Sequence, residues 1–177
     1  MNFEEGWRIW RLGIGPLGAP QLGPPLSDNT YTLPAVWDGN TAMAQCILGC
    51  TSLPGPECRC GLRFYPHTEG FVRIAEGMAA RRTDELLHHW PGYWEKPAVI
   101  SYGVPVGPCY PDPKTGLHGS WRQYWRTGRY EVLALLGWPE YPMQVLGARY
   151  GGIPTFSLDT MPPSELLERV ASSVRQA

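Results

Sequence analysis

Four cysteines lie within fifteen residues of the chain and form its densest group of metal-binding side chains: Cys46, Cys50, Cys58 and Cys60. Their spacing is Cys-x3-Cys-x7-Cys-x-Cys, and a stiff Pro-Gly-Pro turn at 54–56 can fold the second pair back toward the first. Zinc prefers a tetrahedron of ligands, and four thiolates leave no open position for a reacting water molecule. The spacing therefore predicts a structural zinc knuckle over residues 46–61, with all four cysteines as ligands.

Other interpretations of these cysteines stay open. His67 follows the cluster, and it can complete a site made of two or three of the cysteines with Cys50 outside. An iron–sulfur cluster also takes four cysteines, and small apolar thiols without any metal are a further alternative. The fifth cysteine, Cys109, is distant in the sequence and is predicted to be a buried thiol.

A second group of residues combines aromatic rings with arginines. Its members are Trp94, Trp121, Arg122, Tyr124, Trp125, Arg126 and Arg129. Arginine beside aromatic rings can stack on nucleic-acid bases, bind phosphate or contact a protein. We therefore expect a partner-binding surface here. In the alternative, the rings fill the core of the strands that carry them, and the arginine heads reach solvent.

The chain shows no defensible catalytic motif. His118 lies beside Ser120 with Asp112 nearby, but nothing like Gly-x-Ser-x-Gly surrounds the serine. The adjacent His88 and His89 are best explained as an exposed helix end. A small hydrolase built on His118 and Asp112 is therefore only an alternative to a non-catalytic protein.

Composition narrows the class of protein. The 177 residues suffice for one compact domain, and the formal net charge of −1 argues against binding nucleic acid through a broad cationic face. No stretch approaches the roughly 20 apolar residues that cross a membrane. The N-terminal residues lack a secretory signal, so we expect a cytoplasmic protein. Clustered cysteines in the cytoplasm bind metal more often than they form disulfides.

The elements that position these side chains are predicted to be short, because 21 glycines and 19 prolines favour turns. Periodicity predicts strands at 5–12, 31–37, 97–106, 120–124 and 129–136, with a loop at 107–119 and a turn at 127–128. Helices are expected at 69–87, 143–150 and 163–176, and a last extended segment at 153–158. We predict a single α+β domain over residues 1–177. It contains a small antiparallel sheet or half-open β-barrel (the β-rich part at 97–137), short helices and the zinc knuckle.

Three short motifs resemble a group of uncharacterised small proteins from actinobacteria and their phages. They are Ala-x-Cys at 44–46 with Cys-x-Cys-Gly at 58–61, Gly-Trp-Arg-Ile-Trp-Arg at 6–11, and Arg-Tyr-Gly-Gly-Ile-Pro at 149–154. Members of that group carry a histidine before the Cys-x-Cys pair. This chain has none there, so the resemblance implies that Cys50 replaces that ligand. The group implies no activity.

The leading hypothesis is a non-catalytic, zinc-stabilised binding module, phage-encoded if the resemblance holds. It recognises nucleic acid or a protein through the aromatic and arginine residues. The alternative is a phage factor that binds and inhibits a bacterial host protein in the host cytoplasm, which suits the near-neutral charge.

Overall fold

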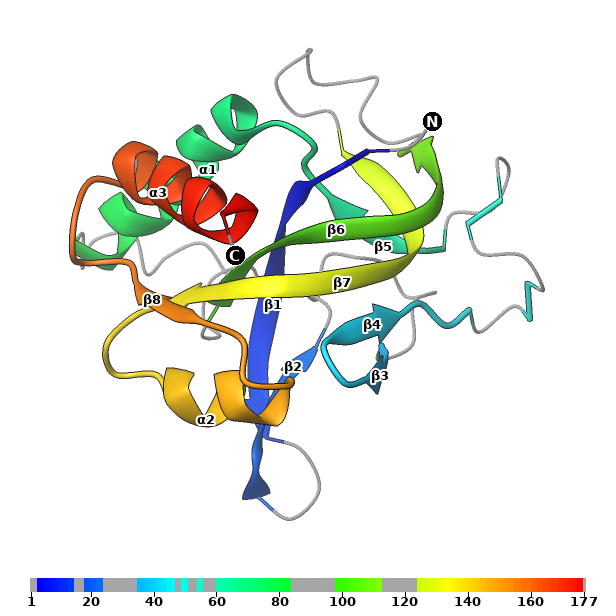
Figure 1. Cartoon of the computed structure of the whole chain (residues 1–177), viewed down its shortest axis with the longest axis horizontal. Coiled ribbons are helices and arrows are strands. Elements are labelled where there is room, and N and C mark those ends of the chain that lie inside the picture. The colour runs from blue at the N-terminus through cyan, green and yellow to red at the C-terminus, as the bar shows by residue number, and fades with distance from the viewer. Residues whose placement is uncertain are drawn as a thin grey trace.

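A curled β-sheet forms the centre of the fold (Figure 1). The computed structural model describes residues 3–14, 18–23, 35–46, 49–50, 54–55, 60–83, 98–112 and 124–176, and within them the sheet has eight strands. The order along its main path is β2 (Pro20–Gly23), β1 (Gly6–Ile14), β6 (Ala98–Pro111), β7 (Trp125–Gly137), β4 (Thr41–Met43) and β3 (Val36–Asp38). Two further strands, β5 (Leu62–Phe64) and β8 (Thr155–Ser157), also pair with β7. All pairs are antiparallel except β7 with β8, which is parallel.

The sheet closes part of the way into a barrel. β5 pairs with the beginning of β7, and the residue after it, Tyr65, bridges back to Trp7 of β1. Two backbone hydrogen bonds of 2.8 Å, one in each direction, join Trp7 and Tyr65. The path β1–β6–β7–β5 therefore returns to β1, which confirms the predicted α+β fold with a half-open barrel.

The two faces of the sheet carry separate cores. Alternate residues of β1 point to opposite faces, so Trp7 packs toward the helices and Trp10 packs inside the curl. The inner core draws on all the longer strands, with Val99, Tyr130 and Leu135 fully buried. Because both faces are covered, even polar residues of the central strands are buried.

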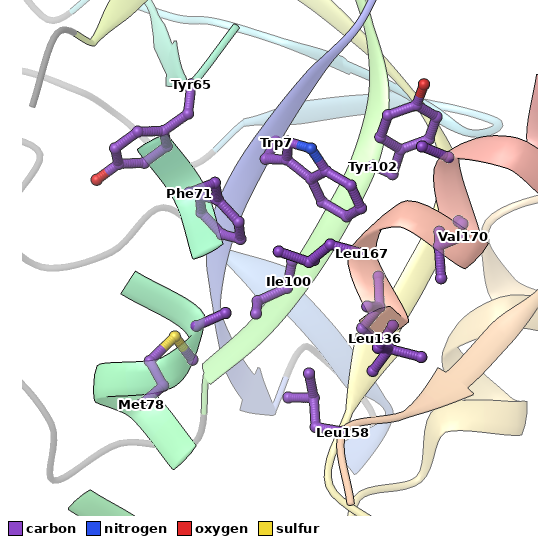
Figure 2. Close-up of a cluster of buried hydrophobic side chains, with 14 of the residues drawn as sticks. Trp7, Tyr65, Phe71, Met78, Ile100, Tyr102, Leu136, Leu158, Leu167 and Val170 are labelled. Carbon is purple, nitrogen blue, oxygen red and sulfur yellow. The ribbon is translucent and has the colours of Figure 1, made fainter. Parts of the chain in front are cut away.

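Helices α1 (Thr68–Thr83) and α3 (Pro163–Arg175) lie side by side over one face of the sheet (Figure 1). Figure 2 shows the core between this layer and the strands, where rings from β1 and α1 meet aliphatic side chains from β6, β7 and α3. Trp7 stacks on Phe71 with ring centroids 5.6 Å apart. The short α2 (Met143–Arg149) packs against β7 and β8.

Most predicted elements are present, including the strand at 129–136, the helix ending before Gly151 and the closing helix at 163–176. Two predictions are wrong. A loop is expected from residue 107, but β6 continues to Pro111. A β-bulge between Val106 and Cys109, with Gly107 at φ +86°, accommodates the extra residue and lets the strand pairing continue. β7 runs unbroken through Thr127 and Gly128, where a turn is expected. The parts of the predicted elements at 31–34, 84–87, 97 and 113–123 lie outside the described residues.

Candidate metal centre

The backbone brings the two ends of the cysteine segment together on one strand. β4 pairs with β7 through Met43 and Arg129, and the next residue, Ala44, donates a 2.8 Å hydrogen bond to the Gly128 carbonyl. The chain returns to the same strand at Leu62, which pairs with Thr127. Residues 45–61 thus leave and rejoin β7 at neighbouring positions. This arrangement places Cys46 and Cys60 close together.

Three cysteine sulfurs form one cluster. The Sγ atom of Cys46 lies 3.4 Å from that of Cys50 and 2.7 Å from that of Cys60, and all three atoms lie within 4.8 Å of one another. Two thiolates on a single tetrahedral zinc lie about 3.8 Å apart when each Zn–S bond is about 2.3 Å. The cluster therefore occupies the space of one metal coordination sphere, and these three side chains can bind a metal ion.

The cluster is only partly shielded from solvent. Cys60 is buried, whereas Cys46 and Cys50 are half-buried. The structure holds all three as thiols rather than as a disulfide. The fourth predicted ligand, Cys58, lies outside the described residues. Among the described residues Cys50 belongs to the cluster, whereas the exposed His67, which directly precedes α1, does not.

The backbone beside Cys60 is held by two features that leave little freedom. Gly61 has φ +119°, and a Cβ atom there would lie 3.2 Å from both Pro54 Cβ and the Thr127 carbonyl oxygen. Glycine is therefore the residue that fits where the chain turns from Cys60 into β5. In addition, the Arg126 guanidinium donates hydrogen bonds to the carbonyls of Cys60 (3.1 Å) and Pro111 (3.3 Å).

Arg126 is thus a supporting residue and not a surface residue. Only 1 % of it is exposed. The prediction that it belongs to a partner-binding surface is wrong, because β7 is covered on both faces where it passes Cys60. Sequence alternation alone gives no sign of this, since a residue between Trp125 and Thr127 faces solvent in a sheet that is covered on one side only.

A buried polar group follows the cysteine segment, and sequence reasoning missed it. Arg63 of β5 donates a hydrogen bond from Nε to Asp112, whose side chain is 3 % exposed. Arg8 of β1 donates to the Arg63 carbonyl, and its guanidinium carbon lies 4.2 Å from the centre of the Trp10 ring. These contacts link β1, β5 and the end of β6.

The described part of the aromatic and arginine group is mostly packed into the fold. Tyr124 is half-buried, with its ring centroid 4.6 Å from that of Tyr65, and Trp125 is half-buried, with its ring centroid 4.7 Å from that of Phe3. Among the four described members, Arg129 alone is exposed. The other three members, Trp94, Trp121 and Arg122, lie outside the described residues.

The remaining candidates add no second centre within the described residues. Cys109 is a buried thiol as predicted, and burial raises its pKa. Asp112 pairs with Arg63, while the other members of the alternative hydrolase site, His118 and Ser120, lie outside the described residues, as do His88 and His89.

The chain matches no protein-family model, no curated protein and no solved structure. The resemblance to small actinobacterial and phage proteins therefore stays a prediction. Among the described helices, none is long and apolar enough to cross a membrane.

Proposed function

We propose that Cys46, Cys50 and Cys60, with Cys58 as the fourth ligand, hold a structural zinc ion. The observation that carries this proposal is the packing of three cysteine Sγ atoms within 4.8 Å of one another. Such separations suit a single ion better than an iron–sulfur cluster, whose four thiolates are divided among two or more irons. Soft thiolate ligands favour zinc among the common divalent ions of cells.

The role of this zinc is to fasten the segment between β4 and β5. Both strands have only three residues and pair with β7, and β4 is paired on its other side with β3. A metal that joins the residues after β4 to those before β5 opposes the separation of either strand from β7. Four thiolates fill the coordination sphere, so the ion supplies folding free energy rather than catalysis.

We further propose that the chain is a non-catalytic binding module and that its partner is a protein. The net charge of −1 supports this choice, because binding to nucleic acid depends on neutralising phosphates. The inward position of Arg126 also removes one cation from the predicted surface and leaves Arg129 as the exposed cation among its described members.

The zinc proposal is tested by metal analysis of the full chain and of two cysteine variants. The wild type is expected to contain about one zinc per chain. Cys60→Ser is expected to lose the metal and to unfold at a lower temperature, because metal-binding free energy is folding free energy. Cys109→Ser is the matched control, since it also removes a buried thiol but lies outside the cluster. Zinc content that is equal in the two variants would contradict the proposal.

The partner proposal is tested by capture from a bacterial lysate with the wild type and with Arg129→Ala. A protein partner is expected to be retained after nuclease treatment and to bind less to Arg129→Ala than to Arg149→Ala, a control at another exposed arginine. Capture that nuclease abolishes, or that falls steeply with added salt, would assign the module to nucleic acid instead.

A further inference from the structure

Two of the three clustered sulfurs are already close to bonding distance. The Sγ atoms of Cys46 and Cys60 lie 2.7 Å apart, which is about 0.7 Å longer than a disulfide bond. The Cys46–Cys50 pair is wider, at 3.4 Å. Cys46 is half-buried and Cys60 is buried, so a small oxidant reaches Cys46 first.

We propose that the knuckle is an oxidation-sensitive site, in which a hydroperoxide joins Cys46 to Cys60 and releases the zinc. This inference rests on the proposed metal centre. It adds a reaction to the site, the reversible oxidation of two thiolates to a disulfide, and it names Cys46 and Cys60 as the pair that reacts.

The reaction balances with hydrogen peroxide as the oxidant. The Cys46 thiolate attacks one peroxide oxygen, the O–O bond breaks, and hydroxide leaves, so that Cys46 becomes a sulfenic acid. The Cys60 thiolate then attacks the sulfur of Cys46, forms the S–S bond and expels a second hydroxide. Two thiolates lose two electrons in total, and the peroxide is reduced to two hydroxides. Removal of two of its four thiolates leaves the site unable to hold the ion.

The backbone favours this pair over any pair that includes Cys50. Cys46 follows β4 and Cys60 precedes β5, and hydrogen bonds to adjacent parts of β7 hold both strands. Arg126 further fixes the Cys60 carbonyl. A Cys46–Cys60 bond therefore forms without moving either strand, and it keeps the two strand ends joined after the metal has left. Cys50 remains a thiol.

The test begins with full-length chain whose zinc content has been measured, to which hydrogen peroxide is added in small molar excess. Zinc release is followed with a chromogenic chelator, and the bridges are mapped by peptide mass spectrometry after alkylation. We expect one zinc released for each Cys46–Cys60 disulfide, alkylated Cys50, and full recovery of bound zinc after a thiol reductant and zinc are added. Cys109→Ser is expected to behave as the wild type.

A second measurement avoids variants that lose the metal. The oxidised, zinc-free chain is expected to melt at a higher temperature than the reduced chain stripped of zinc by a chelator, because the bridge keeps the segment closed. Zinc that stays bound during oxidation, a mapped bridge to Cys50 or Cys58, or equal melting temperatures would overturn the inference and leave the metal centre intact. A chain that binds no zinc would overturn the metal centre itself, and the release step with it.

Discussion

Arg126 shows how one buried cation can organise backbone far from it in sequence. Its guanidinium reaches the carbonyl of Cys60 on one side and that of Pro111 on the other, so it connects the metal segment to the end of β6. The planar guanidinium carries five N–H donors in a fixed geometry, which suits it to bind two carbonyls at once. Arg126 uses a separate nitrogen for each carbonyl, Nη1 for Cys60 and Nη2 for Pro111, whereas a lysine offers one ammonium nitrogen for both.

We expect Arg126→Leu to lower the free energy of unfolding by about 2 kcal/mol, because the buried Cys60 carbonyl and the Pro111 carbonyl both lose hydrogen bonds to a charged donor. Zinc affinity should fall as well, since the Cys60 backbone is no longer fixed. Denaturant unfolding and a competitive zinc titration measure the two effects. Arg129→Leu, at an exposed position of the same strand, is the control, and an equal response of both variants would contradict the supporting role of Arg126.

At the scale of elements, the close approach of β6 and β7 depends on a glycine. A Cβ atom at Gly103 would lie 2.0 Å from the Glu131 carbonyl oxygen, at a register shift between the two strands. Backbone on the neighbouring strand cannot move aside as a flexible side chain can. The central pair of the sheet therefore tolerates no side chain at this position.

Gly103→Ala is expected to destabilise the fold by about 3 kcal/mol, at the upper end of the cost of overpacking. Gly77→Ala is the matched control within α1, where a Cβ atom would meet nothing within 4 Å. Alanine stabilises a helix interior by roughly 0.5–1 kcal/mol relative to glycine. Thermal unfolding should thus shift in opposite directions for the two variants, and a shift in the same direction would exclude the clash.

The elements also show what sequence patterns could and could not reveal. Alternation in β1 and helical spacing in α3 are local signals, and both elements were predictable from them. The pairing of β4 and β5 with one strand is not local, so the spacing Cys-x3-Cys-x7-Cys-x-Cys suggests a cluster without showing that β7 assembles it. The prediction that Arg126 lies on a surface fails for the same reason: strands that are distant in the sequence bury it.

At the scale of the whole molecule, a polar contact ties the beginning of the described chain to its end. Arg175 of α3 donates two hydrogen bonds to the Glu5 carboxylate, one of them 2.8 Å long, and the two residues are 170 positions apart. Tyr102 donates to the same carboxylate, and burial together with Glu5 raises the pKa of Tyr102 to about 12. The hydrogen bonds from Arg175 lower the pKa of Glu5.

This depressed pKa makes the contribution of Glu5 depend on pH. The stabilisation is complete above the pKa of an unfolded-state glutamate, about 4.3, and disappears as the pH falls through the lower folded-state value. We expect Glu5→Gln to lower the free energy of unfolding by about 0.5–1 kcal/mol at pH 7, as for a partly exposed ion pair. The loss should be almost zero once the pH has fallen below the folded-state pKa of Glu5. Melting curves of wild type and variant against pH measure the difference. Glu168→Gln, at an exposed carboxylate of α3, is the control, and an equal loss of stability in the two variants at pH 7 would contradict the role of Glu5.

The return of the sheet to β1 through Tyr65 has a consequence for the order in which the protein is made. β1 is synthesised before Tyr65 and before β6, its two long-range partners. Ser101 of β6, which accepts the hydrogen bond of Trp10, lies 91 residues after Trp10 in the sequence. At about 5–20 residues per second, that interval is on the order of 5–20 s. During it, the two tryptophans of β1, Trp7 and Trp10, are not yet covered by β6. Barrel closure therefore follows the synthesis of β7, the strand through which the path returns to β1.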